Sequence, residues 1–138
     1  MTDTPSYLDI NVDAAQEIHT LPNDSEAMLR VEEAAIVPKK DDAGRNVLYI
    51  MLVDPNDPTV QEVKIWRTVP DEQMENEDPR AYNKALLWWK DFYRAVGHQG
   101  GPLDPDALVG VDVWVILGEE DNTRFGLSNF VRRFVVKR

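Results

Sequence analysis

Apolar and polar residues alternate along three stretches in the first half of the chain, and this period of two is typical of β-strands with one buried face. The stretches cover residues 26–37, 46–54 and 60–69. Turn-forming segments rich in proline and aspartate, at 38–45 and 54–58, separate them. We expect the first two strands to form a hairpin and all three to form an antiparallel meander.

The period lengthens to between three and four residues after position 78, which indicates an amphipathic helix. Asp78 can cap this helix, Pro79 suits its first position, and Gly97 should end it. Its apolar stripe consists of Tyr82, Leu86, Trp89, Tyr93 and Val96. Trp89 lies on this stripe and Trp88 lies beside it, so both are expected in the core.

Alternation returns in the last third of the chain. After a glycine- and proline-rich connection, 97–105, and a short segment, 106–109, apolar residues alternate over 111–117. A turn at 118–122 then leads to a final alternating stretch from about 127 to 136. We expect these last two strands to pair with each other.

The first 25 residues differ from the rest and are expected to form an N-terminal arm ahead of a single domain at 26–138. Within the arm, Leu8, Ile10 and Val12 alternate with polar residues, which is again the period of a strand. The segment is therefore expected to be either a free arm or an edge strand.

The element order is thus three strands, one helix and two strands. This is the order of the five-stranded OB barrel, whose sheet surface and flanking loops bind single-stranded nucleic acid or oligosaccharide. We predict a mainly β fold, a five-stranded OB-like barrel with one α-helix between strands 3 and 4. An α+β sheet with one packed helix uses the same elements, and periodicity alone does not distinguish a closed barrel from an open sheet.

The alternation also predicts which side chains face outward on the second and third strands. The core-facing residues would be Leu48, Ile50, Leu52, Val63 and Ile65. The opposite face would then present Tyr49, Met51, Lys64 and Trp66. Exposed aromatic rings can stack on nucleic-acid bases, and nearby lysines and arginines can bind phosphates.

The last strand repeats this combination, since Phe130, Arg132 and Phe134 would share one face of a regular strand. The candidate nucleic-acid-binding residues are therefore the basic and aromatic side chains of these strands and their turns: Lys39, Lys40, Arg45, Tyr49, Lys64, Trp66, Arg67, Arg124, Phe130, Arg132 and Phe134. The alternative is that the tryptophans and phenylalanines among them, and Trp114 with them, pack under the helix or the arm.

Charge is distributed unevenly along the chain. The 138 residues include 15 basic and 25 acidic ones, for a net charge of −10. This acidity argues against non-specific adhesion to nucleic acid or anionic membranes. The segment 122–138 has no acidic residue and five basic ones: Arg124, Arg132, Arg133, Lys137 and Arg138. The chain is therefore electrostatically polarised, although blocks of like charge are most often solvated surface.

Several classes of chemistry lack support in the sequence. The absence of cysteine excludes disulfides, thiolate zinc sites and a cysteine nucleophile, and it fits an intracellular protein. The two histidines, His19 and His98, lack the spacing of a metal pair or a catalytic triad. We therefore expect no enzymatic activity, cofactor or metal. No apolar run could span a bilayer and no signal peptide is evident, so a soluble, cytoplasmic protein is expected.

Short motifs along most of the chain resemble those of one known family. They are Leu21-Pro22, Met28-Leu29-Arg30-Val31, Lys39-Lys40 before Gly44, Val53-Asp54-Pro55, Asp106-Ala107-Leu108-Val109-Gly110 and Asn129-Phe130-Val131-Arg132-Arg133-Phe134. In these motifs the chain resembles phage-encoded single-stranded DNA-binding proteins. The resemblance implies an OB-type domain that binds single-stranded DNA in bacteriophage DNA replication or recombination, in the infected bacterial cell, with replication or recombination proteins as partners. Such proteins are commonly acidic with a local basic groove, which makes the net charge compatible with DNA binding.

Two hypotheses of function follow. The first is a single-stranded DNA-binding protein without strong sequence preference and without catalytic activity. The alternative is an acidic protein-interaction module, such as a DNA-mimicking inhibitor, that binds a basic partner. A concave surface with basic residues and exposed aromatic rings favours the first, whereas a continuous carboxylate face with buried aromatic rings favours the second. A small hydrolase would require two converging carboxylates, which nothing in the spacing indicates.

Overall fold

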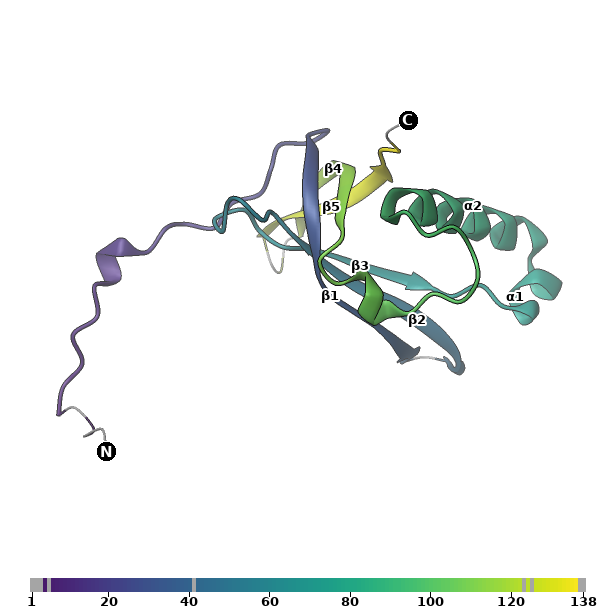
Figure 1. Cartoon of the computed structure of the whole chain (residues 1–138), viewed down its shortest axis with the longest axis horizontal. Helices are drawn as coiled ribbons and strands as arrows, with labels where there is room; N and C mark the ends of the chain where they lie inside the picture. Colours follow the sequence, from purple (N-terminus) through teal and green to yellow (C-terminus); the bar gives the residue numbers. More distant parts are fainter. Residues whose placement is uncertain (1–3, 5, 41, 123, 125, 137–138) are drawn as a thin grey trace.

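Five strands form one antiparallel sheet in the described part of the chain, in the order β3-β2-β1-β4-β5 (Figure 1). The computed structural model describes residues 4, 6–40, 42–122, 124 and 126–136. The strands are β1 (Glu26–Lys39), β2 (Asp42–Val53), β3 (Val63–Thr68), β4 (Asp112–Asn122) and β5 (Gly126–Phe134). The predicted strands of the domain, the three-strand meander and the pairing of the last two strands are confirmed, with shifts at the strand ends.

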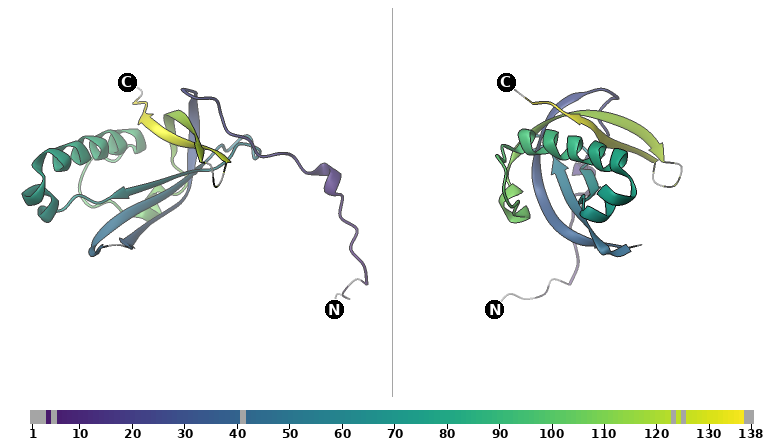
Figure 2. Two further views of the ribbon diagram at one scale, coloured as in Figure 1. Left: turned by 180° about the vertical axis from the view of Figure 1, so that it is seen from behind. Right: turned by 90° about the vertical axis from the view of Figure 1, so that its right-hand side faces the viewer.

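Strand β1 changes partners along its length, and this change bends the sheet. Residues 26–30 of β1 pair with β4, whereas residues 30–39 pair with β2. A register shift between Val31 and Glu33 lies next to the point of change. The sheet therefore has two halves, β3-β2-β1 and β1-β4-β5, which curl towards each other around a common core (Figure 2).

Apolar side chains from both halves fill the space between them. The strands contribute Leu29, Val31, Leu48, Ile50, Leu52, Val63, Ile65, Val113, Val115, Leu117 and Phe134 to the buried cluster. All the residues that the alternation assigns to the core on β2 and β3 belong to it. Burial of each large aliphatic side chain contributes about 1.5–3 kcal/mol to folding, so this cluster is the main source of the stability of the fold.

Helix α2 (Pro79–Val96) begins and ends where the sequence predicts. The Asp78 side chain accepts a hydrogen bond from the Ala81 amide, which caps the first turn. Gly97, with a φ of 75°, ends the helix in the left-handed conformation that glycine adopts without strain. None of the described helices is long and apolar enough to cross a membrane.

Helix α2 packs across the curled sheet (Figure 2), with Phe92 fully buried and with Trp88 and Trp89 partly buried against the core. A short helix that the sequence analysis missed, α1 (Glu72–Glu77), precedes it. The chain then reaches β4 through a 3-10 turn, η2 (Pro105–Leu108).

The N-terminal arm extends away from the sheet on the side opposite α2 (Figure 1). Of the two expectations for this segment, a free arm or an edge strand, the edge strand is not formed, since residues 8–12 contain no β-strand. The described residues before β1 contain only a 3-10 turn, η1 (Val12–Ala14), and one isolated bridge, between His19 and Val60. Alternation produces a strand only where a neighbouring edge supplies hydrogen-bond partners, and no described strand pairs with this part of the arm.

Strands β3 and β5 are the two edges of the sheet, and the antiparallel order requires them to run in the same direction. No ladder joins them in the described residues, so the sheet is open rather than closed into a barrel. The edges nevertheless approach each other, since Gln61 Nε2, just before β3, donates to the Leu127 carbonyl of β5 at 3.5 Å. We call the gap between β3 and β5 the seam.

Candidate nucleic-acid interface

Tyr49 of β2 and Trp66 of β3 lie opposite each other on the outer face of the sheet, as the alternation predicts. Their ring centroids are 4.3 Å apart and their planes are inclined by 34°. Met51 and Lys64 form the next outward-facing pair along the same strands. Trp66 is 60% exposed, whereas Tyr49 is half-buried, so the indole offers a ring face to solvent while the phenol packs against it.

Strand β5 contains a bulge, and this breaks its alternation. The register with β4 leaves Arg132 as an extra residue, so the residues after it change faces. Phe130 lies opposite Gly118 and faces outward, whereas Phe134 lies opposite Val115 and faces the core. The prediction that Phe130, Arg132 and Phe134 share one face is therefore wrong.

Phe134 belongs to the core. It is 9% exposed, and its ring centroid lies 5.5 Å from those of both Trp88 and Phe92. A ring enclosed in this way cannot stack on a base, so the assignment of Phe134 to the binding surface is corrected. Phe134 therefore follows the alternative stated in the sequence analysis, in which the aromatic side chains pack under the helix.

Lys64, Trp66 and Phe130 meet at the seam from opposite edges of the sheet. They are shared by two adjoining depressions of about 180 and 560 Å³, which together we call the seam groove. The seam groove is lined by Gln61, Glu62, Lys64, Ile65, Trp66, Arg67, Trp88, Glu120, Asn122, Leu127, Ser128, Asn129, Phe130 and Val131. The groove thus combines aromatic rings from β3, β5 and α2 with cations from β3.

Two arginines lie over aromatic rings of the groove. The Arg67 guanidinium carbon is 4.7 Å from the ring centroid of Trp88, and that of Arg132 is 5.4 Å from the ring centroid of Phe130. Partial burial lowers the pKa of Arg67 from its usual value, but a guanidinium stays protonated at neutral pH. Interleaved rings and cations are the combination that single-stranded nucleic acids require.

Arg132 also binds the segment that leads into β1. Its Nε lies 3.2 Å from Asp24 Oδ1, and its Nη2 donates to Asn23 Oδ1 at 2.9 Å. Both side chains of the ion pair are well exposed, so the pair contributes only ~0–1 kcal/mol to stability. The guanidinium is thus positioned beside Phe130 by a weak interaction that a phosphate could replace.

Phe130 lies directly over Gly118 of the neighbouring strand. A Cβ atom at position 118 would come within 2.3 Å of the ring. Glycine therefore allows the phenyl ring to lie against the backbone of β4, as an aromatic residue often does beside a glycine in a sheet.

Three predicted residues lie at turns outside the seam groove. Lys39 ends β1, Lys40 follows it in the turn to β2, and Arg124 lies in the turn between β4 and β5. Lys40 and Arg124 are exposed, and Lys39 is half-buried. Lys137 and Arg138, part of the basic C-terminal segment, lie outside the described residues.

Arg45, predicted to bind phosphates, forms ion pairs with carboxylates near helix α1. Its side chain is only 14% exposed, with Nη2 3.3 Å from Glu77 Oε2 and Nε 4.0 Å from Asp71 Oδ2. Asp71 caps helix α1 and Glu77 is its last residue, so Arg45 ties β2 to α1. Because the sequence analysis missed helix α1, it also missed the carboxylates of this region that pair with the Arg45 guanidinium.

Carboxylates border the interface as well. Burial and then the charge of Glu33 raise the pKa of the Tyr49 hydroxyl, and Glu62 adds to this effect. Glu62 and Glu120 also line the seam groove. The surface is therefore mixed in charge rather than uniformly basic. In the described ranges, no three His, Asp or Glu side chains gather closely enough to hold a metal ion.

The sequence analysis missed the role of Asn129, which is buried at the end of the seam. Its Oδ1 accepts from the Leu21 amide at 2.8 Å, and its Nδ2 donates to the Leu21 carbonyl at 2.9 Å and to the Gly118 carbonyl at 3.0 Å. The side chain therefore anchors the root of the arm. The sequence did contain a signal for this role, because Asn129 places an amide side chain at an inward-facing position of an alternating strand.

Together these residues define an aromatic and basic groove at the open side of a β-sheet. The comparison with known proteins gives no relative, since no protein-family model and no curated protein matches the sequence.

Proposed function

We propose that this protein binds single-stranded DNA, without strong sequence preference, across the seam groove and the outer face of β2 and β3. The observation that carries the proposal is the meeting of Trp66, Phe130, Lys64 and Arg67 in one groove. Convergence of basic residues with accessible rings is the feature that separates DNA binding from the acidic-module alternative.

The architecture supports the same site. The strand order, the helix between β3 and β4, and two parallel edges that approach each other support the proposal that this open sheet is a variant of the OB-type barrel. Folds of this kind bind oligonucleotides on the face of strands 2 and 3 and with the loops between strands 1 and 2 and between strands 4 and 5. Those positions carry Tyr49 and Trp66 on the strands, and Lys40 and Arg124 in the loops.

The chemistry of the groove favours single strands. Bases of a single strand can leave their neighbours and stack on Trp66 and Phe130, each stacking contact contributing ~1–3 kcal/mol. In a duplex the same base faces are already stacked, so the rings have nothing to bind. Lys64, Arg67 and Arg132 would meet the phosphates. A protein of this kind would protect single-stranded DNA in bacteriophage replication or recombination without catalysing a reaction.

The net charge of −10 does not oppose this function at close range. Ions in 0.1 M salt screen charges over about 10 Å, so a phosphate in the groove interacts mainly with the cations beside it. Glu62 and Glu120 at the groove should limit affinity and make its dependence on salt shallower, because salt also screens their repulsion of the phosphates.

The test is a titration of the intrinsic tryptophan fluorescence with oligo(dT) and with a duplex of equal length at matched salt. We expect quenching and tighter binding for oligo(dT), because Trp66 and Trp88 line the groove. A poly-glutamate titration serves as the control for polyanion binding. Equal affinity for both DNA forms, or no binding at low salt, contradicts the proposal, and the second outcome favours the acidic-module alternative.

A further inference from the structure

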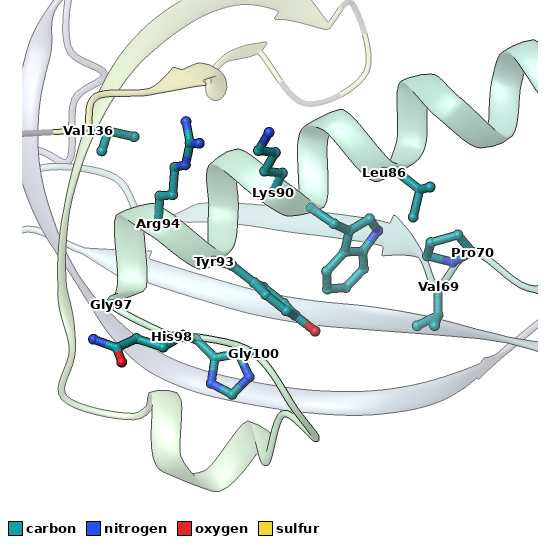
Figure 3. Close-up of a pocket in the computed structure, with 12 residues that line it drawn as sticks. Val69, Pro70, Leu86, Lys90, Tyr93, Arg94, Gly97, His98, Gly100 and Val136 are labelled. Carbon is teal, nitrogen blue, oxygen red and sulfur yellow. The ribbon is translucent and has the colours of Figure 1, made fainter.

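A second and larger groove lies along α2, separate from the seam. It has a volume of about 910 Å³ and is open along the helix (Figure 3). Its apolar wall is formed by Leu86, Trp89 and Tyr93 of α2, Val69 and Pro70 after β3, and Val136 after β5. We call it the α2 groove. Leu86 is 41% exposed, so apolar surface here faces solvent.

The α2 groove is basic in a strongly acidic protein. Lys90, Arg94 and His98 line it, and no acidic residue does so among those the structure describes. Figure 3 shows Lys90 and Arg94 side by side along one side of the helix, with Tyr93 and His98 on the other. Neither Lys90 nor Arg94 forms an ion pair with any described residue. The groove therefore fits an extended segment that is both apolar and acidic.

The N-terminal arm has this composition. Leu8, Ile10 and Val12 are 79%, 68% and 72% exposed, so their side chains touch little of their own domain. Asp9 and Asp13 alternate with them, and residues 4–18 contain no lysine or arginine. In an extended conformation the apolar and acidic side chains point to opposite sides, which suits a groove with an apolar floor and a basic rim.

The position of the arm indicates which groove it meets. Its root is fixed to the domain, since the His19 amide donates to the Thr59 carbonyl and the Gln61 amide donates to the His19 carbonyl, each at 2.8 Å. From there the arm leaves the domain on the side opposite α2 in both Figure 1 and Figure 2. To enter its own α2 groove the arm would have to reverse direction and pass around the domain.

We propose that the arm of one copy docks in the α2 groove of a second copy. Leu8, Ile10 and Val12 pack against the apolar wall, while Asp9 and Asp13 lie near Lys90 and Arg94. Because arm and groove lie at opposite ends of the molecule, the interface is head-to-tail. Such an interface leaves one free arm and one free groove on every dimer, so association continues into linear chains. This self-association does not depend on DNA binding.

The experiment is sedimentation velocity of the full chain without DNA over a range of protein concentrations. We expect dimers and larger species that grow with concentration and shrink with added salt. Replacing Leu8, Ile10 and Val12 by serine, or making Lys90→Glu with Arg94→Glu, should each give a monomer. The matched control is Arg80→Glu with Lys84→Glu, which reverses the same charge on α2 outside the groove and should leave association intact.

Mixing the two monomeric variants provides the decisive measurement. One has an intact groove and the other an intact arm, so the mixture should form a 1:1 heterodimer and nothing larger. A monomeric wild-type chain at all concentrations overturns the proposal, whether the arm is free or docked in its own groove. Association that survives the arm substitutions also overturns it, because another surface would then be responsible.

Discussion

The rings of Tyr49 and Trp66 pack against each other across β2 and β3, with centroids 4.3 Å apart, on the face of the sheet that points away from the core. Cross-strand aromatic pairs of this kind restrict each other's rotamers and contribute a modest stabilisation. The exposed indole is therefore held in place before any ligand arrives. A fixed ring loses less conformational entropy on stacking than a free one, which favours binding.

Replacing Trp66 by alanine should weaken binding to oligo(dT) by ~1–3 kcal/mol, or roughly 5- to 140-fold in Kd. The melting temperature should change little, because the side chain is 60% exposed. Fluorescence anisotropy of labelled oligo(dT) measures the affinity. Trp114→Ala is the control, since this tryptophan is also exposed but does not line the seam groove. A collapse of stability in the Trp66 variant would place this residue in the core.

Removing the charge of Arg132 should reduce the dependence of binding on salt. The slope of log affinity against log salt has a magnitude of ~0.7 for every phosphate that a cation neutralises on a single strand. Arg132→Gln should therefore bind more weakly with a slope shallower by about this amount, and its melting temperature should be nearly unchanged. An unchanged slope would mean that Arg132 serves only to bind Asn23 and Asp24.

The Asp24→Asn substitution offers the complementary test. It removes the carboxylate that competes for Arg132 and keeps a residue that tolerates the positive φ of 66° at this position. Binding should become tighter, and the salt slope should stay the same or steepen. In the double variant Asp24→Asn with Arg132→Gln, the gain in affinity should disappear. A gain in affinity that persists would mean that Asp24→Asn acts through the overall charge of the protein rather than through Arg132.

Phe134→Ala should destabilise the fold by about 3–5 kcal/mol, because it opens a cavity between β5 and α2 beside Trp88 and Phe92. Denaturant unfolding measures this decrease in stability. Phe130→Ala makes the same chemical change on the outer face, so it should cost much less stability while weakening DNA binding. The reverse ranking of the two variants would contradict the bulge-dependent assignment of the faces.

Tyr49 should make stability depend on pH only in alkaline solution. Its pKa is raised above the unfolded value near 10, mainly by burial, so the folded state favours the neutral hydroxyl. The stabilisation of the folded state that follows from this raised pKa is fully present below about pH 10 and is lost as the pH rises through the pKa of Tyr49 in the folded protein. Tyr49→Phe should therefore resist alkaline unfolding better than the wild-type chain, as followed by circular dichroism. Identical alkaline profiles for the two proteins would show that Tyr49 titrates as it does in the unfolded chain.

Elements whose signals are local were predictable from the sequence. The alternation around Ile50 and Ile65 gave the inward and outward faces of β2 and β3 correctly, because both strands are regular and each has one buried face. Helix α2 was predictable from its cap residues Asp78 and Gly97 and from its period. The predicted apolar stripe was only partly right, because it omits the buried Phe92 and includes Leu86, which is 41% exposed. The exposed position of Trp66 followed from the same alternation.

Features that depend on the exact register between strands, or on contacts with elements far away in the sequence, were not predictable. The bulge at Arg132 is defined by the register with β4, and nothing in the sequence of β5 alone marks an extra residue. The pairing of Arg45 depends on helix α1, whose six residues give too short a pattern to recognise. In the arm, alternation over residues 8–12 left an edge strand open as an alternative, but no described strand lies beside this segment to pair with it.

The open seam also bears on solubility. Two unpaired sheet edges are sites where strands of other copies can add, and aggregation follows unless they are protected. Here β3 is only six residues long and carries Lys64 and Arg67, while β5 is bulged and carries Arg132 and Arg133. Short length, positive charge and irregular backbone all disfavour edge-to-edge addition. The cations proposed to bind phosphates thus also keep the edges soluble, so neutralising several of them at once should promote precipitation as well as weaken binding.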